Sequence, residues 1–417
     1  MKSLPSFSGV KLAADNLNGI SFKTPFQFNP RISKNLNCNV YIKREDLQKV
    51  RSFKIRGAFN KINSISKKHR KTGVICASAG NHAQGFAFAC NKLKINGVVY
   101  MPITTPPQKV DQVKTFGEKY ITVKLIGDYF DDCQVIAKSI ADKTNKIFIH
   151  AFDDIKVIEG QATSALEILE QSDKKLDYLF VPIGGGGLIS GVLTVFKELS
   201  PHTKIVGLEP SGAPSMTKSL ENGSVYELDH IDKFVDGAAV KKVGEITLNC
   251  CKKFLDEIIQ VPEGKICQTI LDLYNKDGIV SEPAGALSIA GLEIYTGDII
   301  NKEIGVYICG GNNDIFRTPE IKERALLYAK LKHYFIIKFP QRSGALKDFL
   351  NNVLGPNDDI TFFEYSKKNT RDKAPAVIGV QLKNIKDFDP LIQRMKKHGF
   401  YGEYLNNKPD LLQIWIK

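Results

Sequence analysis

Between residues 74 and 309, short apolar runs alternate with longer segments whose apolar residues recur at helical spacing. Apolar runs of about five residues indicate buried strands, and the amphipathic segments indicate helices. The predicted strands are Val74–Ala77, Gly97–Met101, Ile121–Ile126, Ile147–His150, Tyr178–Pro182, Lys204–Leu208 and Ile304–Cys309. The predicted helices are Ala83–Leu93, Gln108–Phe116, Phe130–Asp142, Glu159–Glu170 and Leu188–Leu199. This alternation predicts an α/β fold with mainly parallel sheets, in which ligands bind beyond the carboxyl ends of strands.

The pattern changes after residue 318. A basic helical segment, Ile321–Leu331, predicts a connector. The elements predicted after it are a strand at His333–Phe339, a helix at Ala345–Val353, strands at Ile360–Tyr365 and Ala376–Leu382, a helix at Phe388–His398 and a strand at Leu411–Ile416. The order β-α-β-β-α-β is that of a ferredoxin-like unit.

Composition is that of an ordinary globular protein. The 417 residues predict two or three domains, and 43% hydrophobic residues suffice for buried cores. Residues 1–16 lack the apolar core of a signal peptide, and no apolar run is long enough to span a bilayer, so we expect a cytoplasmic protein. Eight scattered cysteines without a CxxC pair predict no metal site and suit a reducing compartment.

The net charge of +13 is spread along the chain. Its densest run, residues 67–71, is typical of a solvated helix end, and no nucleic-acid-binding motif accompanies it. We therefore expect neither a nucleic acid nor a membrane as partner. The charge favours anionic substrates or a phosphorylated cofactor.

Lys54 lies between Phe53 and Ile55, just before a helical segment. Apolar neighbours that withhold an amine from water lower its pKa, and a free amine can form a Schiff base with an aldehyde cofactor. The alternative for this run alone is a surface lysine at the start of a helix.

Three loops at strand ends carry further candidate chemistry. Residues 77–85, Ala-Ser-Ala-Gly-Asn-His-Ala-Gln-Gly, open a helix whose amides favour a carboxylate or phosphate. Asn81 either caps this helix or binds a ring substituent of a cofactor. His82 is a candidate ligand or base, although a lone histidine is more often structural.

The second loop contains four consecutive glycines, Gly184 to Gly187, followed by Leu188. Such a run at a strand-to-helix turn indicates a nest of amides around an anion, and no P-loop lysine follows it. One phosphate monoester is therefore favoured over a nucleotide, with a flexible turn as the alternative. In the third loop Cys309 is a neutral group for a heteroaromatic nitrogen or simply a small buried hydrophobe. An aldehyde-reactive amine, a phosphate nest and a neutral ring partner together describe pyridoxal 5′-phosphate.

The chain here resembles the fold type II (tryptophan synthase β-like) pyridoxal-phosphate enzymes, most closely the threonine dehydratases, over roughly residues 10–417. The matching segments are residues 43–47, 52–58, 78–85, 184–188, 207–210, 281–287 and 309–312. The resemblance implies a catalytic domain at residues 1–318, with a smaller subdomain at about 50–150, a connector helix at 319–331 and an ACT-like regulatory domain at 332–417.

The resemblance also assigns roles. Lys54 would be the catalytic Schiff-base lysine, next to Phe53, and Asn81 would bind the cofactor's 3′-oxygen. The amides of Gly184, Gly185, Gly186, Gly187 and Leu188 would hold the phosphate, and Cys309 would face the pyridine nitrogen. The substrate carboxylate would lie against Ser78, Gly80, Asn81 and His82. Racemase relatives carry a serine where this chain has Ala79, which argues against racemisation. They also bind a cation with an aspartate where this chain has Ser215, and no metal site is predicted here.

The implied reaction is the α,β-elimination that converts L-threonine to 2-oxobutanoate and ammonia, the first step of isoleucine biosynthesis. Isoleucine is the effector that the resemblance suggests for the ACT-like domain, and a homo-oligomer (dimer or tetramer) is expected. Three alternatives stay open: a broad L-serine/L-threonine dehydratase, a β-replacing synthase of the same fold type, and a catalytically silent amino-acid sensor.

Overall fold

The computed structural model describes residues 3–128, 130–365, 373–408 and 411, and it divides into two compact units, residues 1–315 and 316–417. The first unit contains two sheets. Its strands are β1 (Phe26–Phe28), β2 (Asn39–Arg44), β3 (Val74–Ala77), β4 (Gly97–Met101), β5 (Ile121–Leu125), β6 (Ile147–Phe148), β7 (Tyr178–Pro182), β8 (Lys204–Pro210), β9 (Glu257–Val261) and β10 (Glu303–Ile308). Its helices are α1 (Phe7–Leu17), α2 (Pro30–Leu36), α3 (Lys54–Asn63), α4 (Lys67–Arg70), α5 (Asn81–Leu93), α6 (Pro107–Gly117), α7 (Phe130–Thr144), α8 (Ile155–Gln171), α9 (Gly187–Leu199), α10 (Ser215–Asn222), α11 (Glu245–Phe254), α12 (Glu263–Asp277) and α13 (Pro283–Glu293), with 3₁₀ turns at Glu45–Leu47 and Glu118–Tyr120. A third 3₁₀ turn, Ile315–Arg317, spans the boundary between the two units in the sequence.

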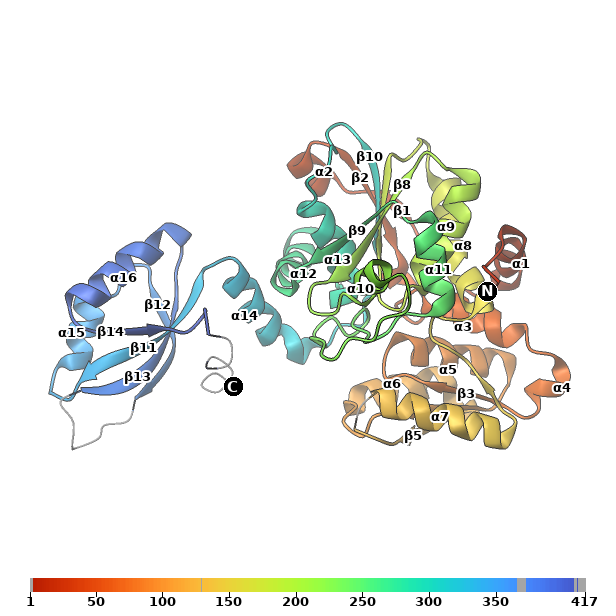
Figure 1. The fold of residues 1–417 in the computed structure, drawn as a ribbon, viewed down its shortest axis with the longest axis horizontal. Coiled ribbons are helices and arrows are strands. Elements are labelled where there is room, and N and C mark those ends of the chain that lie inside the picture. The colour runs from red at the N-terminus through yellow and green to blue at the C-terminus, as the bar shows by residue number, and fades with distance from the viewer. Residues whose placement is uncertain (1–2, 129, 366–372, 409–410, 412–417) are drawn as a thin grey trace. The chain divides into compact units, whose positions relative to one another are not determined.

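The larger sheet has the strand order β1-β2-β10-β7-β8-β9, and all its pairs are parallel except β1 with β2. Helices lie on both of its faces, with α12 and α13 on one side and α8, α9 and α11 on the other (Figure 1). The smaller sheet, β5-β4-β3-β6, is wholly parallel, and it is packed between α5 and α6 on one face and α7 on the other. The predicted α/β fold with mainly parallel sheets is therefore confirmed.

The second unit begins with α14 (Thr318–Tyr328) and continues with β11 (Lys332–Pro340), α15 (Ala345–Asn352), β12 (Asp359–Tyr365), β13 (Lys373–Gln381), a 3₁₀ turn at Ile385–Asp387, α16 (Phe388–Lys397) and β14 (Tyr401–Tyr404). Its antiparallel sheet has the order β12-β13-β11-β14, and α15 and α16 cover one face over a core that includes Phe335, Phe349 and Met395. The ferredoxin-like order is confirmed. The strand that completes it is β14, whereas the predicted strand Leu411–Ile416 lies, apart from Leu411, outside the described residues.

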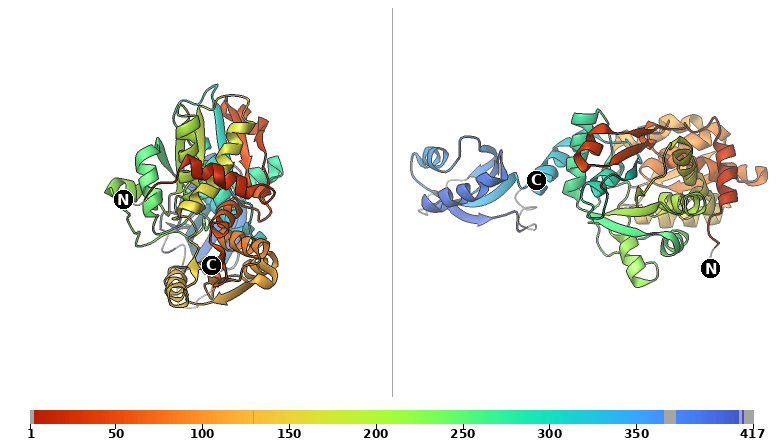
Figure 2. Two further views of the ribbon diagram at one scale, coloured as in Figure 1. Left: turned by 90° about the vertical axis from the view of Figure 1, so that its right-hand side faces the viewer. Right: turned by 90° about the horizontal axis from the view of Figure 1, so that it is seen from above.

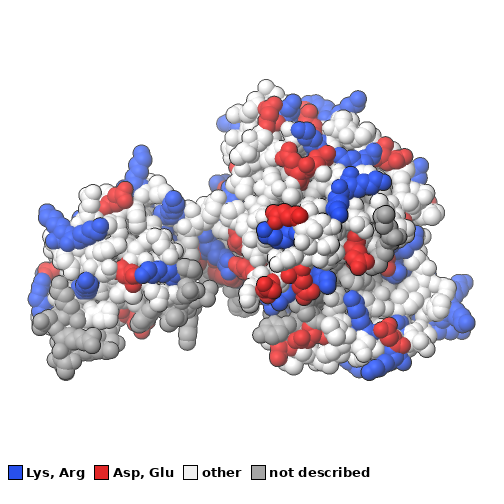
Figure 3. Space-filling view, in the orientation of Figure 1, with Lys and Arg blue, Asp and Glu red and all other residues white. Residues whose placement is uncertain are grey.

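Surface charge does not gather in one patch on the face drawn in Figure 3, where basic and acidic side chains are interspersed. Among the residues that the structure describes, every helix is too short or too polar to cross a bilayer. The left view of Figure 2 shows the small sheet and its helices, in orange and yellow, below the large sheet.

Candidate functional site

A single cavity of about 1350 Å³ in the first unit brings the predicted loops together. Eight of the predicted site residues line it: Phe53, Lys54, Ser78, Gly80, Asn81, His82, Gly185 and Cys309. Gly184, Gly186, Gly187 and Leu188 flank Gly185 without lining the cavity themselves. Segments that are distant in sequence therefore meet at the carboxyl ends of β3, β7 and β10, as expected for a parallel sheet.

Lys54 is the first residue of α3, and its amine donates a hydrogen bond of 3.1 Å to the carbonyl of Ala151. Burial lowers the pKa of this amine from 10.5 to about 8. The start of α3 is fixed to the third loop, because the Phe53 amide donates to the Cys309 carbonyl and Ser52 forms a bridge with Gly310. The amine is thus held at the cavity and is partly unprotonated near neutral pH.

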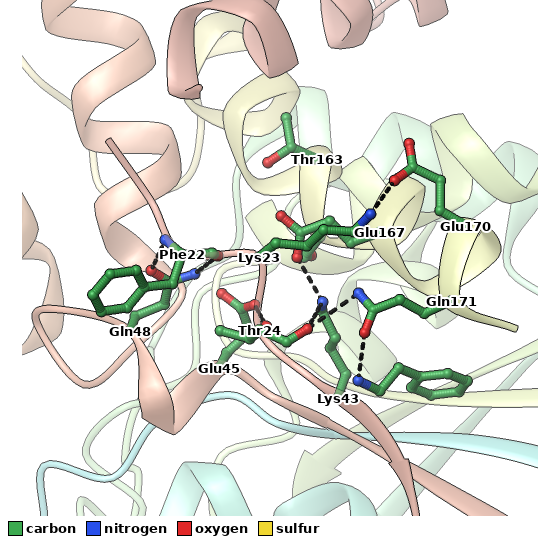
Figure 4. Close-up of polar contacts among 12 residues, drawn as sticks. Phe22, Lys23, Thr24, Lys43, Glu45, Gln48, Thr163, Glu167, Glu170 and Gln171 are labelled. Carbon is green, nitrogen blue, oxygen red and sulfur yellow. Dashed lines mark hydrogen bonds and ion pairs between the residues drawn. The ribbon is translucent and has the colours of Figure 1, made fainter. Parts of the chain in front are cut away.

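A buried ion network forms around Arg56, two residues after Lys54, and Figure 4 shows its members Thr24, Lys43, Glu45 and Glu167. Arg56 pairs with Glu45 at 2.8 Å and with Glu167 at 2.6 Å, and Lys43 pairs with Glu167 at 2.6 Å. Thr24 donates to Glu45 and accepts from Lys43 through its carbonyl. Although burial opposes ionisation, Arg56 holds the pKa of the Glu45 carboxyl below its usual range. The network anchors α3, two residues from Lys54, to β2 and α8.

The four-glycine loop ends at the first residue of α9. Gly186 has φ +89°, a left-handed conformation that favours glycine, and a Cβ at Gly185 would lie 2.3 Å from the Phe152 ring. Thr247 donates to the Gly185 carbonyl at 2.7 Å and so holds the loop from outside. Because the first turn of a helix leaves its amides without intrahelical partners, this cradle can hold an anionic group such as a phosphate.

Asn81 begins α5, but its side chain does not cap the helix, because the N-cap position is Gly80 and no side-chain cap bond forms. Instead the Asn81 amide nitrogen donates to Glu282 at 2.6 Å, and its oxygen accepts from Asn312 at 2.7 Å. The capping alternative is therefore wrong. Burial raises the pKa of the Glu282 carboxyl to about 7.

His82 is buried, and its Nε2 lies 3.2 Å from the carbonyl of Ile149. Burial and the charge of Lys54 lower the pKa of the imidazole to about 3, so the ring is neutral. Since Nε2–H must donate to that carbonyl, Nδ1 is left as an acceptor, and it has no partner among the described residues. An acceptor cannot bind a carboxylate, so a carboxylate contact from this residue would come from its main-chain amide.

Cys309 directly follows β10, and its thiol donates to the Ala284 carbonyl at 3.3 Å. Burial raises the pKa of the thiol well above its usual range, so the sulfur stays neutral. All eight cysteines are free and buried. A neutral sulfur at this point can face a ring nitrogen without imposing a charge on it.

The carboxylate of Glu209 is buried and accepts from the amides of Met216 and Thr217 and from the Thr217 hydroxyl, at 2.6 to 2.8 Å. These three donors come from the start of α10. Over the described part of the chain, no group of three or more histidine, cysteine or acidic side chains could hold a metal ion.

Sequence reasoning did not assign roles to Glu282, Asn312, Gln84 or Phe152, all of which line the cavity or shape its loops. Glu282 precedes Pro283 at the start of α13, a context typical of an ordinary helix N-terminus. Nothing local distinguishes these residues, because their partners lie on other segments of the chain.

The amine, the glycine cradle and the neutral thiol fit pyridoxal 5′-phosphate in the chemistry of their donors, and together with the fold they define a fold type II pyridoxal-phosphate enzyme. Comparison with known proteins agrees. Residues 18–310 match the family model described as pyridoxal-phosphate dependent enzyme, and residues 323–413 match the C-terminal regulatory domain of threonine dehydratase.

The chain is 54% identical over 407 residues to the L-threonine dehydratase biosynthetic IlvA of Halalkalibacterium halodurans, covering 98% of both chains. It is 50% identical over 414 residues to the protein of that name in Bacillus subtilis, covering 99% of this chain and 98% of the relative. Among solved structures, the processed form of threonine deaminase isoform 2 from Solanum lycopersicum is 38% identical, with a TM-score of 0.71, over 78% of this chain and 90% of that one. The chain therefore belongs to the biosynthetic threonine dehydratase family of pyridoxal-phosphate enzymes, in a form with one C-terminal regulatory domain.

Proposed function

We propose that this protein converts L-threonine to 2-oxobutanoate and ammonia in the cytoplasm, that Lys54 is its catalytic lysine, and that isoleucine acts through the C-terminal unit. The observation that carries the proposal is the Lys54 amine, held at the cavity with its pKa lowered to about 8. Bound pyridoxal phosphate supplies an electron sink for the α-carbon of an amino acid.

The cofactor would be held by Lys54 through its amine, by the amides of Gly184 to Leu188 at its phosphate, by Asn81 at its 3′-oxygen and by Cys309 at its ring nitrogen. The substrate carboxylate would lie against Ser78 and the main-chain amides of Gly80 to His82, at the start of α5. Lys54 is placed to remove the α-proton as general base, and burial in the cofactor-free chain already lowers the pKa of its amine to about 8. The neutral Cys309 thiol leaves the ring nitrogen without a strong proton partner, which favours elimination over racemisation.

The test is 2-oxobutanoate formation from L-threonine by the purified holoenzyme, with and without isoleucine. We expect turnover of threonine, inhibition by isoleucine, and no turnover after Lys54→Ala, whereas the exposed control Lys68→Ala keeps the activity. Normal turnover by Lys54→Ala would overturn the assignment of the lysine.

The second candidate, a broad serine/threonine dehydratase, is separated in the same assay by kcat/KM for both amino acids. A ratio near one between the two kcat/KM values favours the broad serine/threonine dehydratase. We also expect a homo-oligomer, a dimer or tetramer, which light scattering of the holoenzyme measures.

A further inference from the structure

The amide of Asn81 can face the cavity with either its nitrogen or its oxygen, and the hydrogen bonds around it fix the choice. The fixed point is the main-chain carbonyl of Val50, which can only accept. The Asn312 side chain lies 2.9 Å from it and must therefore present Nδ2 there.

The orientation of Asn312 then sets that of Asn81. Asn312 Nδ2 also lies 2.7 Å from one end of the Asn81 amide and 3.0 Å from Gln84 Oε1. The two hydrogens of Nδ2 are shared among the three acceptors, and an Asn81 nitrogen at 2.7 Å would set one donor against another, so the end of Asn81 that faces Nδ2 is the oxygen. The nitrogen of Asn81 then faces Glu282 Oε1 at 2.6 Å, and the carboxylate accepts one of its two hydrogens.

The residues around Asn81 are buried and closely packed. Glu282 is only 4% exposed, and a Cβ at Gly310 would lie 2.2 Å from Glu282 Oε1. Gln84 is buried as well, and it donates to Gln112 at 2.9 Å, which extends the chain of hydrogen bonds along the cavity wall. Because unpaired polar groups are costly when buried, a flipped Asn81 would set its nitrogen against the Asn312 donor at 2.7 Å and its oxygen against the ionised Glu282 carboxylate.

We propose that Glu282 and Asn312 are positioning residues, which hold the Asn81 amide so that its second N–H is available to the cofactor's 3′-oxygen. The inference rests on the proposed role of Asn81 in binding the cofactor. Neither residue touches the reacting atoms in this account, and both act through Asn81.

The test measures how tightly the full-length holoenzyme holds its cofactor. The enzyme is diluted, and the readout is the concentration of free pyridoxal 5′-phosphate that maintains half of the visible absorbance. We expect Asn81→Ala, Asn312→Ala and Glu282→Ala each to raise this concentration by about tenfold, the loss of one hydrogen bond to a charged group. The exposed control Glu198→Gln leaves it unchanged.

Double variants separate a positioning role from a merely structural one. If Asn312 and Glu282 act through Asn81, adding either change to Asn81→Ala has little further effect, whereas independent roles would multiply to about a hundredfold. Asn312→Asp, which keeps the shape but presents an oxygen to Asn81, is expected to weaken binding more than Asn312→Ala; a packing role predicts the reverse.

Three outcomes overturn the proposal. Asn312→Ala and Glu282→Ala retain the cofactor as tightly as the wild type does, or the effects of the single changes multiply in the double variants. The third is that Asn312→Asp weakens cofactor binding less than Asn312→Ala does. If Asn81→Ala alone retains the cofactor as well as the wild type does, the role of Asn81 under the proposed function fails first. Should Glu282→Ala not fold, Glu282→Gln, which loses only the charge, takes its place in the double variant.

Discussion

Two buried groups of charges lie near the start of α3, and they are built differently. The ion network contains two cations, Lys43 and Arg56, and two anions, Glu45 and Glu167, in direct contact. In the cavity, the Lys54 amine donates to the Ala151 carbonyl and forms no ion pair with any described residue, and the Glu282 carboxylate is paired with neutral amides. Charges in direct ion pairs stay ionised. The two cavity groups feel opposite charges only at longer range, so burial dominates and moves their pKa values toward neutrality, where they can exchange protons.

The largest effect should come from breaking the network. Arg56→Met leaves Glu45 buried without its main counter-charge, and we expect a loss of about 3–5 kcal/mol in the free energy of unfolding. Urea unfolding of the cofactor-free protein at pH 7 measures it. A loss below about 1 kcal/mol, the usual value of an exposed ion pair, would contradict the idea that the network is a structural anchor.

The opposite sign is expected for Lys54→Met. The folded pKa of about 8 lies below the ordinary 10.5, so the lysine costs stability at neutral pH, and the cost disappears as pH rises from 8 to 10.5. At pH 7 the free energy of unfolding of the variant should exceed that of the cofactor-free wild type by about 3 kcal/mol, and this difference should vanish near pH 10.5. A variant less stable than the wild type at pH 7 would show that the buried charge of Lys54 does not cost stability.

Glu282→Gln tests the acid of the cavity. Its folded pKa of about 7 lies above the ordinary 4.5, so the stability that the protonated acid contributes at low pH is lost as pH rises from 4.5 to 7. Asp236 adds to this loss and Lys109 opposes it. The stability of the variant relative to wild type should therefore increase by roughly 2–3 kcal/mol over that interval. A difference that does not change with pH would place the pKa of Glu282 in its ordinary range.

The smallest effect is expected at the exposed edge of the network, where Lys23 pairs with Glu170 at 2.8 Å and both side chains are more than half exposed. Lys23→Ala should change the unfolding free energy by less than about 0.5 kcal/mol. A loss comparable to that of Arg56→Met would mean that burial is not what separates the two kinds of pair.

Strands buried on both faces were predictable from the sequence. Val74–Ala77, Gly97–Met101 and Tyr178–Pro182 are observed with the predicted bounds, since each is a short apolar run ended by a turn or helix signal. β2 escaped prediction because Lys43, an apparent surface residue, is buried in the ion network. β6 ends at Phe148 rather than His150, although the Ile149 amide still donates to Ile75 of β3, and from His150 onward the chain forms the cavity wall.

In the candidate site, too, some features could be predicted from the sequence and others could not. The loops at strand ends were recognisable, because glycines, Asn81 and Cys309 stand directly after apolar runs. The partnership of Asn81 with Glu282 was not, since it joins residues 201 positions apart and depends on how two loops meet. The neutral state of His82 was not predictable either, since it follows from burial of the ring and from the nearby charge of Lys54.

The most direct measurement is borohydride reduction of the holoenzyme followed by peptide mass spectrometry. We expect the pyridoxyl phosphate mass on the peptide that contains Lys54, and none on the exposed Lys67 and Lys68. An unmodified Lys54, or a label on another lysine, would contradict the account.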